Sequence, residues 1–288
     1  MKFSKYHALG NDYLVITPQE AGDLPRQPEM IHRICHRNYG IGSDGILLGP
    51  LATPGADFGL RIFNPDGSEA EKSGNGIRIF SRWLWDQGLV HANPFTIWTA
   101  GGVVGVQIYA GGKSIQVQMG RVSFDSQKIP VSGPAREVNQ ETLEVAGEKL
   151  LYCAVAIGNP HCVILCDVVS TEKVKQLGPL IENEARFPNR TNVQFMRIID
   201  KNNIYIEIWE RGAGYTLASG SSSCAAAAAA HRLGFCEPKI TVNMPGGKLE
   251  ITIGVDDQVM MTGPVTRIAE GELSNEIFSD KINAGGLQ

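Results

Sequence analysis

The chain has 288 residues, of which 43% are hydrophobic and 19% are charged, and its formal net charge is −4. A chain of this length can bury a core without metal or disulfide staples, and it suggests roughly two domains of about 150 residues each. The mildly acidic balance, without a basic stripe, argues against nucleic acid as a partner. The longest apolar run, residues 224–230, is far too short to cross a membrane, and the first residues do not read as a signal peptide. Composition therefore predicts a cytoplasmic protein that acts on a small molecule and engages no membrane.

Most of the chain is predicted to form strands, because apolar segments are punctuated by glycine-containing turns. In chain order, the predicted strands are residues 13–16, 59–63, 95–99, 103–109, 114–119, 152–157, 162–166, 192–198, 204–209, 239–243, 248–253 and 259–262.

Two helices interrupt these strands. Apolar residues recur at helical spacing between Ser73, a suitable N-cap, and Gly88, a suitable stop. A second helix is predicted between Ser219 and Gly234, with six consecutive alanines at 225–230. Because alanine is small on every side, this helix is expected to run through the middle of a domain, close to its neighbours.

The chain repeats itself at about half its length. The pair at 10–11 (Gly-Asn) recurs at 158–159, an offset of 148, and the pair at 73–74 (Ser-Gly) recurs at 219–220, an offset of 146. Each copy runs through a strand, a long middle, a strand, a loop, Ser-Gly and a helix. The repeat predicts an α+β fold of two pseudo-symmetric domains, each a curved, mostly antiparallel sheet wrapped around a central helix.

The repeat also predicts the domain boundaries. The N-terminal half is expected to cover residues 1–119 and to be completed by residues 265–288, and the C-terminal half to cover residues 120–264. Six cysteines lack CxxC spacing, so we expect small core residues and neither disulfides nor a metal site. They are Cys35, Cys153, Cys162, Cys166, Cys224 and Cys236.

The two helix starts have a chemical use. Unpaired backbone amides and the positive end of the dipole bind an anion such as a carboxylate. Ser73 and Ser219, related by the repeat, are predicted to lie on opposite sides of one ligand, which suits removal of a proton on one face of a carbon and its delivery on the other. A single Ser-Gly before a helix is most often only a cap. Two such Ser-Gly pairs at matching positions of the repeat favour a functional role.

Several motifs together resemble the diaminopimelate epimerase family, and they occur in that family's order over nearly the whole chain. They are residues 7–12 (HALGND), 40–45 (GIGSDG), 63–71 (FNPDGSEAE), 73–76 (SGNG), 158–161 (GNPH), 190–192 (RTN) and 210–214 (ERGAG). The resemblance implies a two-domain, pseudo-symmetric α+β fold. It also implies inversion of an amino-acid α-carbon without pyridoxal phosphate, other cofactor or metal, and a homodimer.

The resemblance further implies roles for individual residues. The distal amino-acid end of the substrate would be held by Asn11, Asn64, Asn159, Asn192 and Arg211, with Arg211 paired to its carboxylate. Glu210 would also contact the substrate. The reacting α-carboxylate would meet the backbone of Gly74, Asn75, Gly220 and Ser221. The acid/base positions would be Ser73 and Ser219, with His161 and Glu210 close to the reacting centre. Read alone, Asn11 and Asn159 are also compatible with turns, and His161 with a core or surface histidine. Glu210 and Arg211 are compatible with a solvated charge pair.

The chain departs from the family where chemistry matters most, because the family has cysteine at the positions of Ser73 and Ser219. A thiol is brought to thiolate by a helix N-terminus, whereas a serine hydroxyl needs an adjacent base. Two explanations are open: a deliberate double replacement that traps intact substrate, or native serines with weaker, altered or assisted chemistry. Tyr215 and Gly45 are further departures.

Three functions are therefore weighed. The first is epimerisation of LL- to meso-diaminopimelate, a lysine and peptidoglycan precursor, in a form impaired by its serines. The second is a racemase or epimerase of another amino acid that uses serine bases. The third is a catalytically silent amino-acid-binding homologue.

Overall fold

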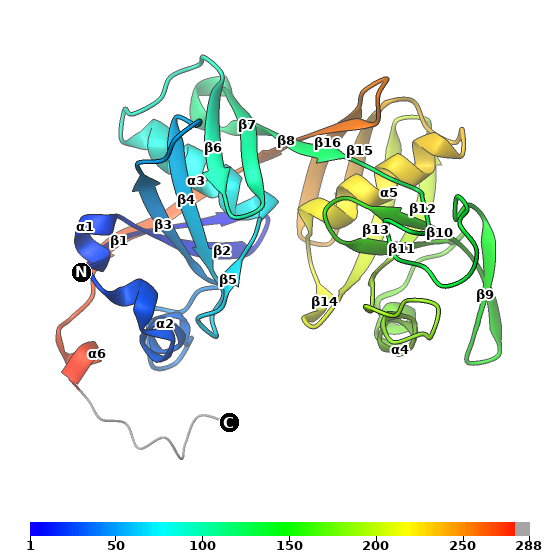
Figure 1. Cartoon of the computed structure of the whole chain (residues 1–288), viewed down its shortest axis with the longest axis horizontal. Coiled ribbons are helices and arrows are strands. Elements are labelled where there is room, and N and C mark those ends of the chain that lie inside the picture. The colour runs from blue at the N-terminus through cyan, green and yellow to red at the C-terminus, as the bar shows by residue number, and fades with distance from the viewer. Residues whose placement is uncertain (280–288) are drawn as a thin grey trace. The chain divides into compact units, whose positions relative to one another are not determined.

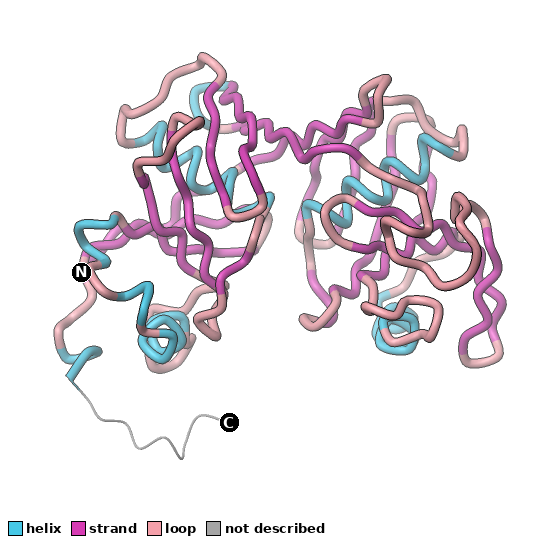
Figure 2. The backbone as a smooth tube through the Cα atoms, viewed as in Figure 1, coloured by secondary structure: helices cyan, strands magenta, loops and turns pink. Residues whose placement is uncertain are grey.

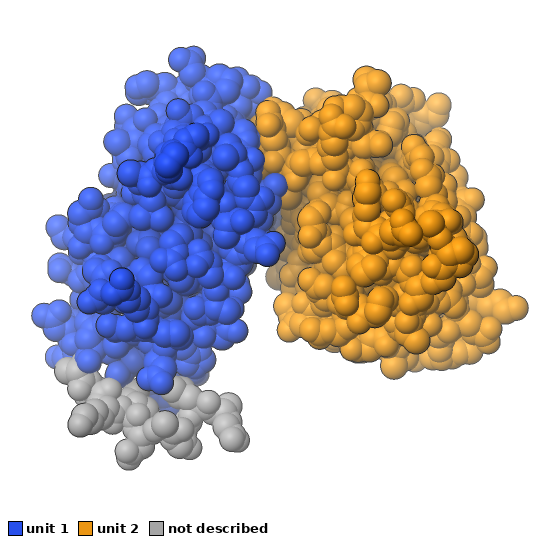
Figure 3. Space-filling model, viewed as in Figure 1, with its two compact units in different colours: residues 1–113, 265–288 blue, residues 114–264 orange. Residues whose placement is uncertain are grey.

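The computed structural model describes residues 1–279 and divides into two compact units (Figure 1). One unit contains residues 1–113 and the chain from 265 onward, and the other contains residues 114–264 (Figure 3). The division falls before residue 114 rather than near 120, because the strand Ser114–Arg121 pairs along its length with the strand Gln258–Pro264. The strand Thr266–Glu272 pairs with the first strand of the chain, and the expected residues 280–288 lie outside the described part.

The strands and helices have the following bounds. The strands of the first unit are β1 (Lys2–Ala8), β2 (Asn11–Ile16), β3 (Ile46–Leu51), β4 (Phe58–Phe63), β5 (Glu69–Ala70), β6 (Phe95–Thr99), β7 (Gly102–Tyr109) and β18 (Thr266–Glu272). Its helices are α1 (Pro18–Ala21), η1 (Leu24–Arg26), α2 (Pro28–Cys35), α3 (Gly74–Asp86), η2 (Ala110–Gly112) and α6 (Glu276–Ser279). The strands of the second unit are β8 (Ser114–Arg121), β9 (Glu141–Val145), β10 (Glu148–Ala156), β11 (Pro160–Leu165), β12 (Asn192–Asp200), β13 (Asn203–Glu210), β14 (Gly214–Thr216), β15 (Lys239–Met244), β16 (Gly247–Ile253) and β17 (Gln258–Pro264). Its helices are α4 (Thr171–Glu182) and α5 (Gly220–Arg232).

The internal repeat is visible in the strand pairing. In the first unit, β1, β2, β3, β4, β6 and β7 are joined in that order by antiparallel, parallel, antiparallel, parallel and antiparallel pairings. In the second unit, β10, β11, β12, β13, β15 and β16 are joined by the same series. The short strands β5 and β14 are added to β4 and β13 in the same way. The predicted α+β fold of two pseudo-symmetric sheet-and-helix halves is confirmed.

The helices α3 and α5 are the central helices of their units, and Figure 2 shows each running among the strands of its own unit. Both have 13 residues. Every alanine from 225 to 230 is at most 2% exposed, as expected of a helix whose small side chains allow close packing on all sides. Gly88 and Gly234 follow the two helices with positive φ values of 69° and 74°, so the predicted glycine stops are confirmed.

Several elements were not predicted by periodicity. The helices α2 and α4 were missed, as were the strands β1, β3, β9 and β18. The six cysteines are all free, and all except the half-buried Cys166 are buried. Within residues 1–279, none of the helices combines the length and apolar character needed to cross a membrane.

Candidate functional site

Both predicted serines cap the central helix of their own unit. The Ser73 hydroxyl accepts a hydrogen bond from the Gly76 amide at 3.0 Å, and the Ser219 hydroxyl accepts one from the Ser222 amide at 3.4 Å. Ser73 is partly exposed, whereas Ser219 is buried. A hydroxyl that accepts one hydrogen bond keeps its own proton and a second lone pair. Capping and a role toward a ligand are therefore compatible at both positions.

Among the hydrogen bonds within residues 1–279, neither cap uses the first two amides of its helix. The hydroxyl of each serine binds the third helical amide, and its carbonyl binds the fourth. The first two amides face out of the helix start, where the dipole favours negative charge. They belong to Gly74, Asn75, Gly220 and Ser221, the residues that the family resemblance assigns to the α-carboxylate.

In the first unit, the structure brings Asn11 and Asn75 together at the start of α3. The Asn75 side-chain amide donates to the Asn11 Oδ1 at 3.0 Å, and Asn75 Oδ1 accepts from the buried Arg78 guanidinium at 2.8 Å. The Tyr13 hydroxyl lies 3.5 Å from the Ser73 hydroxyl. These contacts form one polar half-site around the Ser73 cap.

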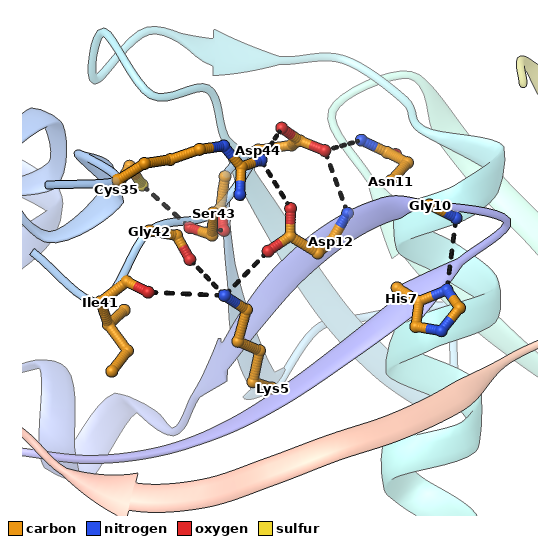
Figure 4. A network of polar contacts seen from close by, with 12 residues as sticks. Lys5, His7, Gly10, Asn11, Asp12, Cys35, Ile41, Gly42, Ser43 and Asp44 are labelled. Carbon is orange, nitrogen blue, oxygen red and sulfur yellow. Dashed lines mark hydrogen bonds and ion pairs between the residues drawn. The ribbon is translucent and has the colours of Figure 1, made fainter. Parts of the chain in front are cut away.

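A charged network behind this half-site fixes Asn11 (Figure 4). The Asp44 carboxylate accepts from the Asn11 side chain at 2.8 Å and from the Asp12 amide at 3.0 Å. Arg37 donates to Asp44 at 2.6 Å and to Asp12 at 2.8 Å, and Lys5 pairs with Asp12 at 2.9 Å. Burial would raise the pKa of Asp12, but hydrogen bonds from Arg37 and Lys5 outweigh it and lower that pKa. The Asn11 carboxamide thus has a defined orientation, with its oxygen toward Asn75.

Asn64 lies apart from this pair, in the turn between β4 and β5. Its side-chain amide donates to the Ser68 hydroxyl at 3.0 Å, and its backbone amide donates to the Ser68 carbonyl at 2.8 Å. The turn therefore holds Asn64 through its own residues, and its side chain is partly exposed.

The two departures at Gly45 and Tyr215 have structural reasons. A Cβ at Gly45 would lie 2.3 Å from the Phe63 carbonyl oxygen, so a close backbone approach requires glycine there. The Tyr215 hydroxyl donates to Glu207 at 3.1 Å, and the Lys175 ammonium lies 4.9 Å from the centre of its ring. Both residues contact other protein groups.

In the second unit, Glu210 lies against the Ser219 cap. Burial raises the pKa of the Glu210 carboxyl, and its hydrogen bond with the Ser219 side chain opposes that rise. A carboxyl with a raised pKa accepts a proton more readily than an exposed one. Ser219 therefore has a proton acceptor beside it, which is what a serine needs to act on a substrate proton.

His161 joins the same helix start as a neutral ring. It is 0% exposed, and its Nε2 lies 2.8 Å from Asn159 Oδ1. Burial and the nearby Arg211 charge lower its pKa to about 3, although the neighbouring Gln194 side chain opposes this. The Gln194 side chain in turn donates to the Ser222 hydroxyl at 3.0 Å. The structure thus links Asn159 and His161 to the first turn of α5.

The lowered pKa of His161 predicts how the free energy of unfolding depends on pH. Between its ordinary value of 6.5 and about 3, the unfolded chain binds a proton at His161 that the folded chain does not bind. Its contribution to stability is therefore present above pH 6.5 and lost as the pH falls toward 3. In urea unfolding over this range, His161→Gln should flatten the fall of unfolding free energy with pH. His91→Gln, at an exposed position, should leave the slope as it is, and equal slopes for all three proteins would contradict the prediction.

Asn192 and Arg211 are also brought together. The Arg211 amide donates to Asn192 Oδ1 at 3.0 Å, and the Asn192 side chain donates to the Pro160 carbonyl at 2.9 Å. One guanidinium nitrogen of Arg211 donates to the Asn189 carbonyl at 3.0 Å. Because a guanidinium carries five N–H donors, Arg211 keeps others for a carboxylate.

Comparison with known proteins identifies the family of the chain that carries these two sets of residues. The diaminopimelate epimerase family profile matches residues 3–124 and 153–268. The chain belongs to the diaminopimelate epimerase family. It is 62% identical over 279 residues to the diaminopimelate epimerase 2 of Nostoc sp., covering 97% of this chain and 98% of that protein. It is 39% identical over 284 residues to the diaminopimelate epimerase of Desulfitobacterium hafniense, covering 97% of this chain and all of that protein.

Solved structures share the diaminopimelate epimerase fold at low identity. A hydroxyproline epimerase from Agrobacterium vitis with bound trans-4-hydroxy-L-proline has a TM-score of 0.69 at 14% identity, covering 95% of this chain and 90% of that chain. A predicted epimerase from Pseudomonas aeruginosa has a TM-score of 0.67 at 16% identity, covering 94% and 98% of the two chains. These likenesses support the fold, and family membership makes the chain an isomerase.

Sequence reasoning missed the residues that support the polar clusters at the starts of α3 and α5. Asp44 lies inside the 40–45 motif, so its charge beside three glycines was a signal that could have been followed. Arg37 and Gln194 have no local motif, because they contact Asp12 and Ser222, which lie 25 and 28 residues away in the sequence.

Proposed function

We propose that this chain binds diaminopimelate and inverts its α-carbon without a cofactor, in lysine and peptidoglycan-precursor synthesis. Ser73 and Ser219 occupy the acid and base positions in this reaction. The observation that carries the proposal is the pair of equivalent caps in a chain of this family. Each serine begins the central helix of its unit, 146 residues apart, with two unused amides beside it.

Binding follows from the charges of the two half-sites. The unused amides of residues 74–75 and 220–221 receive the α-carboxylate, whose charge the helix dipoles stabilise as the carbon loses its proton. Arg211 pairs with the distal carboxylate, and the asparagines hold the distal amine and carboxylate by hydrogen bonds. Asn11 has the oxygen of its carboxamide directed by Asp44, as described above.

The two serines differ in their ability to act as bases. Ser219 can pass its proton to Glu210, whose raised pKa suits it to accept one. Ser73 has the Tyr13 hydroxyl at 3.5 Å, and a phenol is a weak acid rather than a ready base. The Ser219 side is therefore the base and the Ser73 side the acid in the favoured direction. Turnover is slow, because a serine hydroxyl ionises far less readily than a thiol.

A catalytically silent amino-acid-binding protein is the second candidate. It is favoured by the same contact, because the side-chain hydroxyl that lies 3.5 Å from the Ser73 hydroxyl is the weakly acidic phenol of Tyr13. A racemase for another amino acid would be favoured if Tyr215 acted on the ligand, but the Tyr215 hydroxyl donates to Glu207 at 3.1 Å.

Calorimetric binding and α-hydrogen exchange together test the proposal. Diaminopimelate is expected to bind more tightly than lysine, which lacks the distal carboxylate, and to exchange its α-hydrogen slowly in deuterated water. Binding without any exchange favours the silent homologue. Tighter binding of another amino acid that does exchange favours a different racemase. No binding of diaminopimelate contradicts the proposed function.

A further inference from the structure

A buried carboxylate outside the predicted site accepts hydrogen bonds from the segment that carries Glu210 and Arg211. Glu182 is the last residue of α4 and is 6% exposed. Its Oε2 accepts from the Trp209 indole nitrogen at 2.7 Å, and its Oε1 accepts from the Gly212 amide at 2.9 Å. These two donors immediately flank Glu210 and Arg211 in the chain. One carboxylate therefore holds both ends of this dipeptide.

The same helix makes a second contact with Trp209. Gly178 lies one turn before Glu182 and so faces the same side of α4. A Cβ at Gly178 would lie 2.6 Å from Trp209 Cγ, so the indole packs directly on the bare helix backbone. Helix α4 thus fixes Trp209 by close packing at one point and by a hydrogen bond at another.

Glu182 also holds the segment that contains Asn192. Its Oε1 accepts from the Arg190 guanidinium at 3.1 Å, and its backbone carbonyl accepts from the Thr191 amide at 3.2 Å. Asn192 follows directly, and its Oδ1 accepts from the Arg211 amide at 3.0 Å. Both segments that carry the Arg211 half-site therefore meet at Glu182.

We infer that Glu182 is a positioning residue, which sets the place of Glu210 and Arg211 and through them the affinity for a distal carboxylate. The charge of Glu182 is essential to this role, because donors occupy both of its oxygens. A carboxamide has one oxygen, so glutamine at 182 would turn an N–H donor toward either Trp209 or the Gly212 and Arg190 donors. The ligand part of the inference rests on the proposed function. The positioning part does not.

The positioning part is tested without a ligand, by NMR of the Trp209 indole N–H, with Trp209→Phe to assign the resonance. Glu182→Gln and Glu182→Ala are expected to move this resonance upfield and to speed hydrogen exchange at the Gly212 amide, while Glu182→Asp moves it less. Glu148→Gln is the matched control. Glu148, in β10, forms an ion pair with Lys173 of α4 at a partly exposed position, so this variant also removes a carboxylate that contacts α4. An unchanged resonance in folded Glu182→Gln overturns the inference.

The ligand part is tested by calorimetry with the same variants. Glu182→Gln should weaken diaminopimelate binding about tenfold, a loss of about 1.4 kcal/mol, and should weaken lysine binding much less. Gly178→Ala, which displaces the Trp209 ring without touching the carboxylate, should shift the same selectivity. Lower unfolding free energy with unchanged affinities would mean a merely structural role and would overturn the inference. If the parent chain binds no diaminopimelate, the proposed function fails while the NMR result still decides the positioning role.

Discussion

Replacing both Ser73 and Ser219 with cysteine is expected to raise the rate of diaminopimelate epimerisation by at least about a hundredfold, within the range that a well-placed acid or base contributes. The reason is the position of the two side chains at helix starts, where unused amides and the dipole stabilise a thiolate. The measurement is the initial rate of inversion at saturating substrate. Calorimetry should show little change in affinity, because serine and cysteine differ by one atom.

The single replacements sharpen this test. Ser73→Cys should gain more than Ser219→Cys, because Ser219 already has Glu210 beside it. In the Ser73→Cys chain, Glu210→Gln should remove most of the gain. A double replacement that is no faster than the parent chain would show that these serines do not contact the reacting carbon.

Arg211→Met is expected to weaken diaminopimelate binding about thirtyfold or more. Truncating one partner of a hydrogen-bonded charge pair costs about 2–5 kcal/mol, and each 1.4 kcal/mol is tenfold in affinity. Lysine binding should change much less, since lysine has no distal carboxylate for Arg211 to pair with. The measurement is calorimetry of both ligands.

Arg232→Met is the control for this prediction. Arg232 ends α5, at the opposite end from the Ser219 cap, and pairs with Glu137 at 2.5 Å. Its loss should leave both affinities unchanged. Equal losses of diaminopimelate and lysine in Arg211→Met would place Arg211 elsewhere than at the distal carboxylate.

The central helices could be predicted from the sequence because their signals are local. A serine cap, an apolar stripe or alanine run, and a glycine stop all act within a few residues of each other. Helix α4 was not predicted, because Gly178 and Pro179 lower its intrinsic helix propensity. The structure shows why Gly178 is present, since the Trp209 ring leaves no room for a side chain.

Of the candidate site, only the residues that stand in short sequence motifs could be predicted. Asn11, Asn75, Asn192 and Arg211 stand in short motifs, and the structure joins them in two pairs. Glu182 could not be found, because its role depends on where a distant strand brings Trp209. A buried carboxylate that serves such a contact looks in sequence like any other helix-ending glutamate.

Hydrogen isotope tracing at the α-carbon tests most directly whether two groups act on one carbon. The Ser73→Cys/Ser219→Cys chain is incubated with LL-diaminopimelate in deuterated water, and substrate and product are analysed at early conversion. Two opposed groups predict solvent deuterium in the inverted product and the original hydrogen in the remaining substrate. Inverted product that keeps the substrate hydrogen, or deuterium in recovered LL-substrate as fast as in product, would contradict a two-base epimerase.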